Sequence, residues 1–254
     1  MLYTLQEQLA LTGSTLMLAG AVALLAGAVR GFAGFGLSAI IMAALAVQIS
    51  PVALIPVCFV LEAFASVFMF RGGMSEGNKP LVLKLTAGYA LGMPLGLSAT
   101  HAASTELSST IALTLIMALV VIHLLHGSRH FAHARWHPPV AGLLAGVGTG
   151  LASVGGLVIA LYMLLSQMDA RQMRGSLILF LFLNMLITAF WLIVSGTLNI
   201  LALKRALTLA PLLIIGVLIG TALFRPSLEP YYKRVCLVLL LGLASVGLVR
   251  KLIA

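Results

Sequence analysis

The sequence predicts an all-α polytopic membrane protein made of two inverted repeats, each a glycine-broken re-entrant helical hairpin plus three transmembrane helices. Three observations support this fold class: an apolar composition, two glycine-rich breaks at matching positions, and an uneven distribution of basic residues. Hydrophobic residues make up 61% of the 254 residues, and charged residues only 8%. A water-soluble domain of this size cannot bury so much apolar surface, so we expect a membrane protein.

Six segments have the length of about 20 apolar residues that a bilayer-spanning helix needs. They are residues 51–70, 80–100, 106–126, 175–195, 205–224 and 231–250. Two further regions, 14–49 and 139–168, are too long for one straight helix across about 30 Å of hydrocarbon. The apolar pieces beside their glycines are short, which favours re-entrant hairpins, with full spanning as the alternative. The predicted domains are a first transmembrane repeat (1–127), a cytoplasmic linker (128–138) and a second transmembrane repeat (139–254).

The two long regions contain related glycine-rich sequences. Residues 24–37 read LLAGAVRGFAGFGL, and residues 143–156 read LLAGVGTGLASVGG. Adding 119 to the first number of each pair superposes Gly27 on Gly146, Gly31 on Gly150, Gly36 on Gly155 and Gln48 on Gln167. Glycine-interrupted apolar segments at matching positions of two halves are typical of a transporter binding site.

The basic residues indicate the topology. If each glycine-rich region enters and leaves on the same side, ten basic residues share one side: Arg71, Lys79, Lys84, Arg129, Arg135, Arg171, Arg174, Arg225, Lys233 and Arg234. Only four share the other side: Lys204, Arg205, Arg250 and Lys251. Because cytoplasmic connections carry the excess of Lys and Arg, the first side is cytoplasmic. Both termini then lie outside the cytoplasm of a multi-pass inner-membrane protein, and the odd number of crossings per half inverts the repeats. Eight ordinary spans in two parallel repeats are the alternative.

Paired glycine-rich breaks in a small, two-repeat, apolar chain resemble the sulfite exporter TauE/SafE family of membrane permeases. The resemblance covers the chain from about Leu16 to Lys251. Its second break departs from the family pattern of three glycines followed by proline, because it reads Ser153-Val154-Gly155-Gly156-Leu157. The resemblance implies secondary transport of small anions, sulfite or organosulfonates, with export favoured over uptake.

The breaks themselves suit an anion. Helices that restart after Gly36 and Gly156 would present unpaired N–H groups and positive dipole ends near the bilayer midplane. Tight packing of short helices is the alternative role of the glycines, and interface packing that of the two glutamines. The expected substrate-binding residues are Arg30, Gly31, Gly34, Phe35, Gly36, Gln48, Thr149, Gly150, Ser153, Gly155, Gly156 and Gln167.

Two charged residues stand within the predicted membrane region. The Arg30 guanidinium could grip a sulfonate or carboxylate with two parallel hydrogen bonds, or lie at an interface if its hairpin spans fully. Glu62, in the span 51–70, either pairs with a cation such as Arg30 or takes up protons during transport. Its repeat position holds Leu181, and Asn184 supplies the nearest polar group of the second half.

Other functions fit the sequence less well. Five histidines (123, 126, 130, 133 and 137) recur at helical spacing and could, with Glu62, serve a cation or transition-metal transporter. Pro138 and the pair Gly127-Ser128 interrupt that helix, which favours a solvated linker without metal. No nucleotide-binding loop or nucleophile–base pair is present, so we expect neither a cofactor nor an enzyme. The net charge of +9 comes from dispersed topology residues, so the expected partners are a small anion, lipid and, as a candidate coupling ion, the proton, with no nucleic acid. The sequence does not indicate an oligomeric state.

Overall fold

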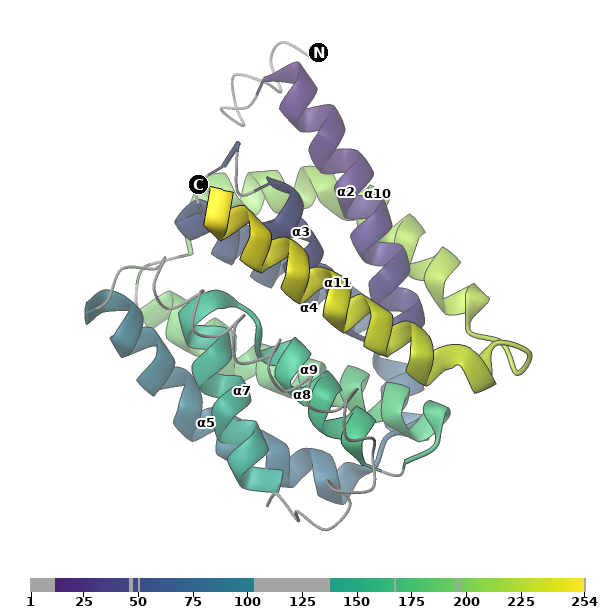
Figure 1. Ribbon diagram of the computed structural model, residues 1–254. Coiled ribbons are helices and arrows are strands. Elements are labelled where there is room, and N and C mark those ends of the chain that lie inside the picture. Colours follow the sequence, from purple (N-terminus) through teal and green to yellow (C-terminus); the bar gives the residue numbers. More distant parts are fainter. Residues whose placement is uncertain are drawn as a thin grey trace.

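The computed structural model describes residues 12–45, 48–49, 51–102, 138–166, 168–194, 196 and 198–253. Within these ranges every regular element is a helix, as predicted (Figure 1). The elements are α2 (Gly13–Ala33), α3 (Leu37–Leu45), α4 (Pro51–Glu76), α5 (Lys79–Ala102), α7 (Pro138–Ala152), α8 (Gly155–Leu165), α9 (Ala170–Val194), α10 (Ile200–Leu223), the single 3₁₀ turn η1 (Glu229–Tyr231) and α11 (Tyr232–Ile253). The predicted span 106–126, the histidine segment and Gln167 lie outside the described residues.

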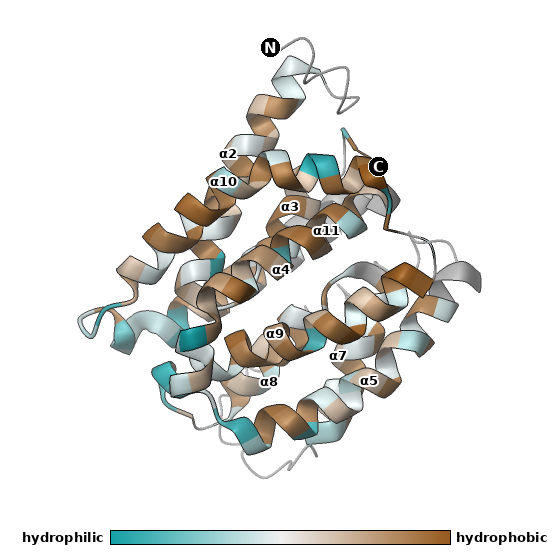
Figure 2. Ribbon diagram, turned by 180° about the vertical axis from the view of Figure 1, so that it is seen from behind, coloured by the Kyte–Doolittle hydropathy of each residue, from teal (hydrophilic) through white to brown (hydrophobic). Residues whose placement is uncertain are grey.

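Five of these helices, α2, α4, α5, α9 and α10, are long and apolar enough to cross a membrane. Hydrophobic residues, drawn in brown, make up much of the length of these helices (Figure 2). Leucines such as Leu83 and Leu91 of α5 and Leu218 of α10 are more than half exposed, which is unfavourable in water and favourable in lipid. The protein is therefore a multi-pass membrane protein.

Both glycine-rich regions break where the sequence predicts a break. Helix α2 ends at Ala33 and α3 begins at Leu37, while α7 ends at Ala152 and α8 begins at Gly155. The helices on the two sides of each break differ in length, however. Helix α2 has 21 residues, about 31 Å and enough for a full span, whereas α3, α7 and α8 have 9, 15 and 11. The last three are each shorter than the roughly 30 Å hydrocarbon core.

The turn after each broken helix requires an unusual backbone conformation. Gly34 and Gly36 have φ values of 84° and 95°, a region that side chains other than glycine rarely adopt. Ser153, which occupies the register position of Gly34 in the second half, has a φ of 55°. A serine in this conformation stores about 1–2 kcal/mol of strain, and strain of this kind concentrates at functional sites.

Close glycine contacts join the two halves. Gly88, Gly92 and Gly96 of α5 pack against the backbone of α7, and a Cβ at Gly92 would overlap the Leu143 carbonyl. Gly27 and Gly31 of α2 pack in the same manner against α10. Helix α7 is the repeat equivalent of α2, and α10 is the repeat equivalent of α5. The first helix of each half therefore packs against a helix of the other half. Spacing of glycines by four residues permits this close approach of membrane helices.

Substitution of Gly92 by alanine is expected to destabilise the protein by about 1–3 kcal/mol, because the α5 and α7 backbones must separate to admit the methyl group. Gly72 is the matched control, since a Cβ there meets nothing within 4 Å. Gly72→Ala is expected to be neutral or to stabilise α4 by up to about 1 kcal/mol. Thermal unfolding of the two variants in detergent measures the change in stability that each substitution causes. Equal effects would contradict the close packing of α5 and α7.

Helices α4 and α9 pack antiparallel at the centre of the molecule. Phe70 and Phe182 lie 4.3 Å apart between ring centroids, and an added Cβ on Gly77 would contact the Gly175 backbone. Helix α10 also packs on α4, and α5 on α9, while α11 crosses both short helices α3 and α8. The sequence places Arg174 in a connection between helices, whereas the structure places it within α9, which begins at Ala170, and buries it to 5% exposure.

Candidate functional site

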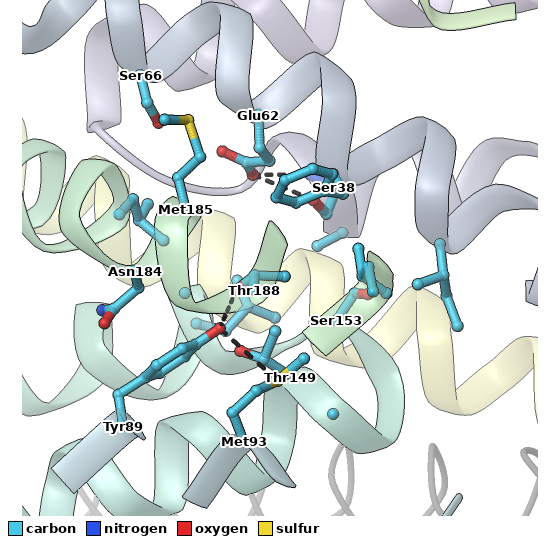
Figure 3. A pocket seen from close by; sticks show the side chains of 18 of the residues that line it. Ser38, Glu62, Ser66, Tyr89, Met93, Thr149, Ser153, Asn184, Met185 and Thr188 are labelled. Carbon is cyan, nitrogen blue, oxygen red and sulfur yellow. Dashed lines mark hydrogen bonds between the residues drawn. The ribbon is translucent and has the colours of Figure 1, made fainter. Parts of the chain in front are cut away.

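A cavity of about 270 Å³ lies between the two helix breaks (Figure 3). Side chains of α4, α5 and α9 complete its walls. It is lined by Gly36, Ser38, Ala39, Ile55, Phe59, Glu62, Ser66, Tyr89, Met93, Leu97, Thr149, Gly150, Ser153, Gly156, Leu157, Leu181, Asn184, Met185, Thr188 and Leu192. Both halves of the chain therefore contribute to one cavity.

The first break is organised around an ion pair. Nε of Arg30 lies 3.1 Å from Oε2 of Glu62, without the alignment of a hydrogen bond. Arg30 donates instead to the Gly34 carbonyl and, at 3.1 Å, to Oγ of Ser66. Oε1 of Glu62 accepts from Oγ of Ser38 at 3.1 Å and from the Ser38 backbone N–H at 3.4 Å. The Glu62 carboxylate therefore lies at the N-terminus of α3, where the helix dipole favours a negative charge.

The buried C-terminus of α2 is fully capped. Arg174 donates to the carbonyls of Gly31 and Phe32, at 2.6 and 3.1 Å, and the Tyr232 hydroxyl donates to that of Ala33 at 2.6 Å. These carbonyls have no partner within the helix, so they need donors from elsewhere. Two arginines at this end also match the negative pole of the helix dipole. Both arginines therefore hold the break in place.

Hydroxyl groups connect α5, α7 and α9 on the other side of the cavity. The Tyr89 hydroxyl lies 2.7 Å from Oγ1 of Thr188 and also hydrogen-bonds Thr149 (Figure 3). Thr149 itself donates to the Ala145 carbonyl at 2.9 Å. Thr149 must therefore accept from Tyr89, and Tyr89 from Thr188, so these hydroxyl protons are engaged within the protein.

Asn184 is the unsatisfied polar side chain of the cavity wall. It is only 2% exposed, and neither its amide nitrogen nor its amide oxygen has a hydrogen-bond partner among the described residues. Leaving such a group unpaired in a buried site costs about 1–3 kcal/mol. A ligand that pairs with this carboxamide would recover that energy.

The two helix N-termini that meet the cavity differ. At α3 the Glu62 carboxylate accepts from Ser38, as described above. At α8 the N–H groups of Gly155 and Gly156 donate no hydrogen bond to any residue that the structure describes. The repeat counterpart of Glu62 is Leu181, whose side chain lies 3.7 Å from a Cβ placed on Gly156. The α8 terminus therefore faces an apolar side chain where the α3 terminus faces a carboxylate.

The structure brings together about half of the expected site residues. Those that line the cavity are Gly36, Glu62, Thr149, Gly150, Ser153, Gly156 and Asn184. Those outside its lining are Arg30, Gly31, Gly34, Phe35, Gln48 and Gly155. Arg30 is completely buried among protein groups, Gly31 packs against α10, and Gln48 is exposed.

Sequence reasoning missed four polar lining residues: Ser38, Ser66, Tyr89 and Thr188. Ser38 could have been predicted from sequence, because a hydroxyl in the first turn of a helix after a glycine break can bind a ligand at the helix N-terminus. The other three are single polar residues in long apolar helices, and nothing in their local sequence distinguishes them.

A polytopic helical protein with a cavity between two broken helices, into which several polar side chains project, belongs to the class of membrane transporters. The sulfite exporter TauE/SafE family model matches residues 19–247. The chain therefore belongs to this family of membrane transporters for sulfite and related sulfur anions. Searches of curated proteins and of solved structures find no match.

Proposed function

We propose that this protein exports small sulfur oxyanions, sulfite or organosulfonates, by secondary transport, and that it binds them in the cavity between the helix breaks. The observation that carries the proposal is Asn184, a buried and unpaired carboxamide in a cavity wall that also contains the open N-terminus of α8. Such N–H groups and amides bind oxyanions without a permanent positive charge.

Transport by alternating access between inverted halves is part of this proposal. The register of 119 residues carries Ser66 onto Met185, and both line the cavity where α4 and α9 pack antiparallel. A two-fold operation that reverses a membrane-spanning helix must have its axis in the membrane plane. The packing therefore supports inverted rather than parallel repeats, and we place both termini outside the cytoplasm on the distribution of basic residues.

Glu62 remains a candidate for proton coupling as well as for the ion pair. Its side chain is 22% exposed and lines the cavity, while its partner Arg30 is fully buried. Protonation would release the carboxylate from Ser38 and Arg30 and so alter the first break. An imposed pH gradient in the flux experiment below tests this coupling.

Replacement of Asn184 by leucine is expected to reduce transport while leaving the protein as stable or more stable. Leucine removes both unpaired polar atoms and keeps the same branched arrangement of four side-chain heavy atoms, with its larger methyl groups beside the cavity, a change that is neutral or favourable for folding. A lost hydrogen bond to a charged ligand costs about 1.5–3 kcal/mol, roughly a ten- to hundredfold loss of affinity. Efflux of radiolabelled sulfite and ethanesulfonate from proteoliposomes, together with thermal unfolding, measures the two effects.

Ser98→Ala is the control for this substitution, because Ser98 is exposed on α5 and its hydroxyl bonds only the Leu95 carbonyl. Unchanged flux in Asn184→Leu would remove the cavity from the transport path. The anion proposal would be wrong if no anion crossed the membrane or stabilised the folded protein. Stabilisation of the protein by divalent metals in the same experiments would instead indicate a cation transporter.

A further inference from the structure

We propose that the substrate carries a single anionic headgroup on a short apolar body, and that Glu62 excludes anions with two charged ends. The inference rests on the proposed function and narrows its substrate class. It follows from the unequal occupation of the two helix N-termini that meet in the cavity.

The first terminus already holds an anion that belongs to the protein. Glu62 accepts hydrogen bonds from the hydroxyl and the backbone N–H of Ser38, at 3.1 and 3.4 Å. Arg30, 3.1 Å away, balances its charge and is itself inaccessible to a ligand. A second anionic group placed here would meet a carboxylate whose cation is already engaged, and like charges at this depth repel strongly.

The second terminus lacks the internal anion, and its break shares one feature with the first, a positive φ at Ser153, the register position of Gly34. Leu181 stands at the register position of Glu62, and Thr149 at that of Arg30. The N–H group of Gly156, which lines the cavity, has no acceptor within the described part of the chain. One helical turn beyond Leu181, Asn184 is unpaired although it is 98% buried, as its 2% exposure shows. Gly156 and Asn184 therefore supply the cavity with donors that no protein group occupies, and we assign the headgroup to this half of the cavity.

Beside the hydroxyl groups of Ser66, Tyr89, Thr149, Ser153 and Thr188, most of the remaining wall is apolar. Its larger hydrophobic members come from four helices: Ile55, Phe59, Met93, Leu97, Leu157, Leu181, Met185 and Leu192. The volume of about 270 Å³ corresponds to roughly nine water molecules at ~30 Å³ each, more than a bare oxyanion fills. The lining therefore suits an alkyl group attached to the headgroup.

Ethanesulfonate and sulfoacetate provide a matched pair for the test, because they differ by the exchange of a methyl group for a carboxylate. Their dissociation constants are obtained from thermal stabilisation of the purified full chain in detergent, at pH 7 and equal ionic strength. Ethanesulfonate is expected to bind at least roughly tenfold more tightly, since a second charge has no partner. In Glu62→Gln the affinity ratio is expected to shift at least tenfold toward sulfoacetate, because the side chain at the α3 terminus no longer carries the negative charge that repels a second anionic group.

The wild-type comparison alone decides the inference if Glu62→Gln fails to fold. Equal or tighter binding of sulfoacetate to the wild type would overturn it, and so would an unchanged ratio in a folded Glu62→Gln. Binding of sulfite with no binding of ethanesulfonate would also overturn it, since the apolar wall would then have no role. All three outcomes leave the proposed anion transport intact. If no anion bound at all, both the proposed function and this inference about the substrate would be wrong.

Discussion

Arg30→Met is expected to destabilise the protein by about 3–5 kcal/mol, the usual cost of breaking a buried ion pair from one side. Arg30 is 0% exposed and pairs with Glu62 at 3.1 Å. Its loss would leave the Glu62 carboxylate without a cation and the Gly34 carbonyl without its donor. Methionine keeps an unbranched chain of comparable reach, so the loss reports mainly on the charge and its hydrogen bonds.

Unfolding in detergent, by heat or denaturant, measures this effect. Arg71→Met is the matched control, because Arg71 is exposed on the same helix as Glu62 and a surface change of this kind is expected within about 0.5 kcal/mol. The double variant Arg30→Met/Glu62→Gln should lose less than the sum of the two single variants, since the buried charge disappears with its partner. A loss in Arg30→Met no larger than in Arg71→Met would refute the structural role of the pair.

The helix breaks could be predicted from sequence because glycine acts locally. Gly34 and Gly36 adopt positive φ values, and the repeat register found the second break as well. The unequal lengths of the helices on the two sides of each break could not be predicted. Gly27 and Gly31, which the sequence also assigns to the first break, lie within α2 and pack against α10. Only this contact, nearly 190 residues away in the chain, distinguishes a packing glycine from a turn glycine.

The roles of the arginines also depend on distant partners. Arg30 sits beside the glycines, and the sequence predicts either a substrate ligand or an interfacial residue. The structure places it in the interior, where its charge pairs with Glu62 and its N–H group donates to Ser66, both on α4. From sequence, Arg174 is indistinguishable from a basic residue of a connection. Its role becomes visible only in the structure, where it donates to the carbonyls of Gly31 and Phe32, 142 and more residues earlier in the chain. Hydropathy and charge counting do not contain these long-range contacts.

Some of the cavity-lining residues could likewise be predicted from sequence, and others could not. Thr149, Ser153 and Gly156 were predictable because they lie at a break, and Glu62 and Asn184 because polar groups are rare in membrane helices. Tyr89 and Thr188 were not, since their meeting depends on how α5 packs against α9. Local chemistry therefore identifies the polar ends of the site, and helix packing determines which residues complete it.

Leu181→Glu is expected to weaken anion binding strongly, because it would give the second helix N-terminus the internal carboxylate that Glu62 gives the first. Leu181 lies beside Gly156, within reach of the α8 N–H groups that the proposed substrate uses. The new carboxylate would occupy those donors and repel a second anion, so ethanesulfonate affinity should fall by roughly tenfold or more.

Leu181→Gln separates charge from size, since glutamine has the same reach as glutamate but no charge. Binding is therefore expected to be weaker in Leu181→Glu than in Leu181→Gln, by the thermal-stabilisation titration used for the wild type. A higher melting temperature of Leu181→Glu in the absence of ligand would indicate that the carboxylate has reached the helix terminus. Equal ethanesulfonate binding by the two variants would mean that the headgroup lies elsewhere in the cavity. Weaker binding by the glutamate variant alone would identify the α8 terminus as the end of the cavity that holds the substrate charge, because the two side chains differ there only in charge.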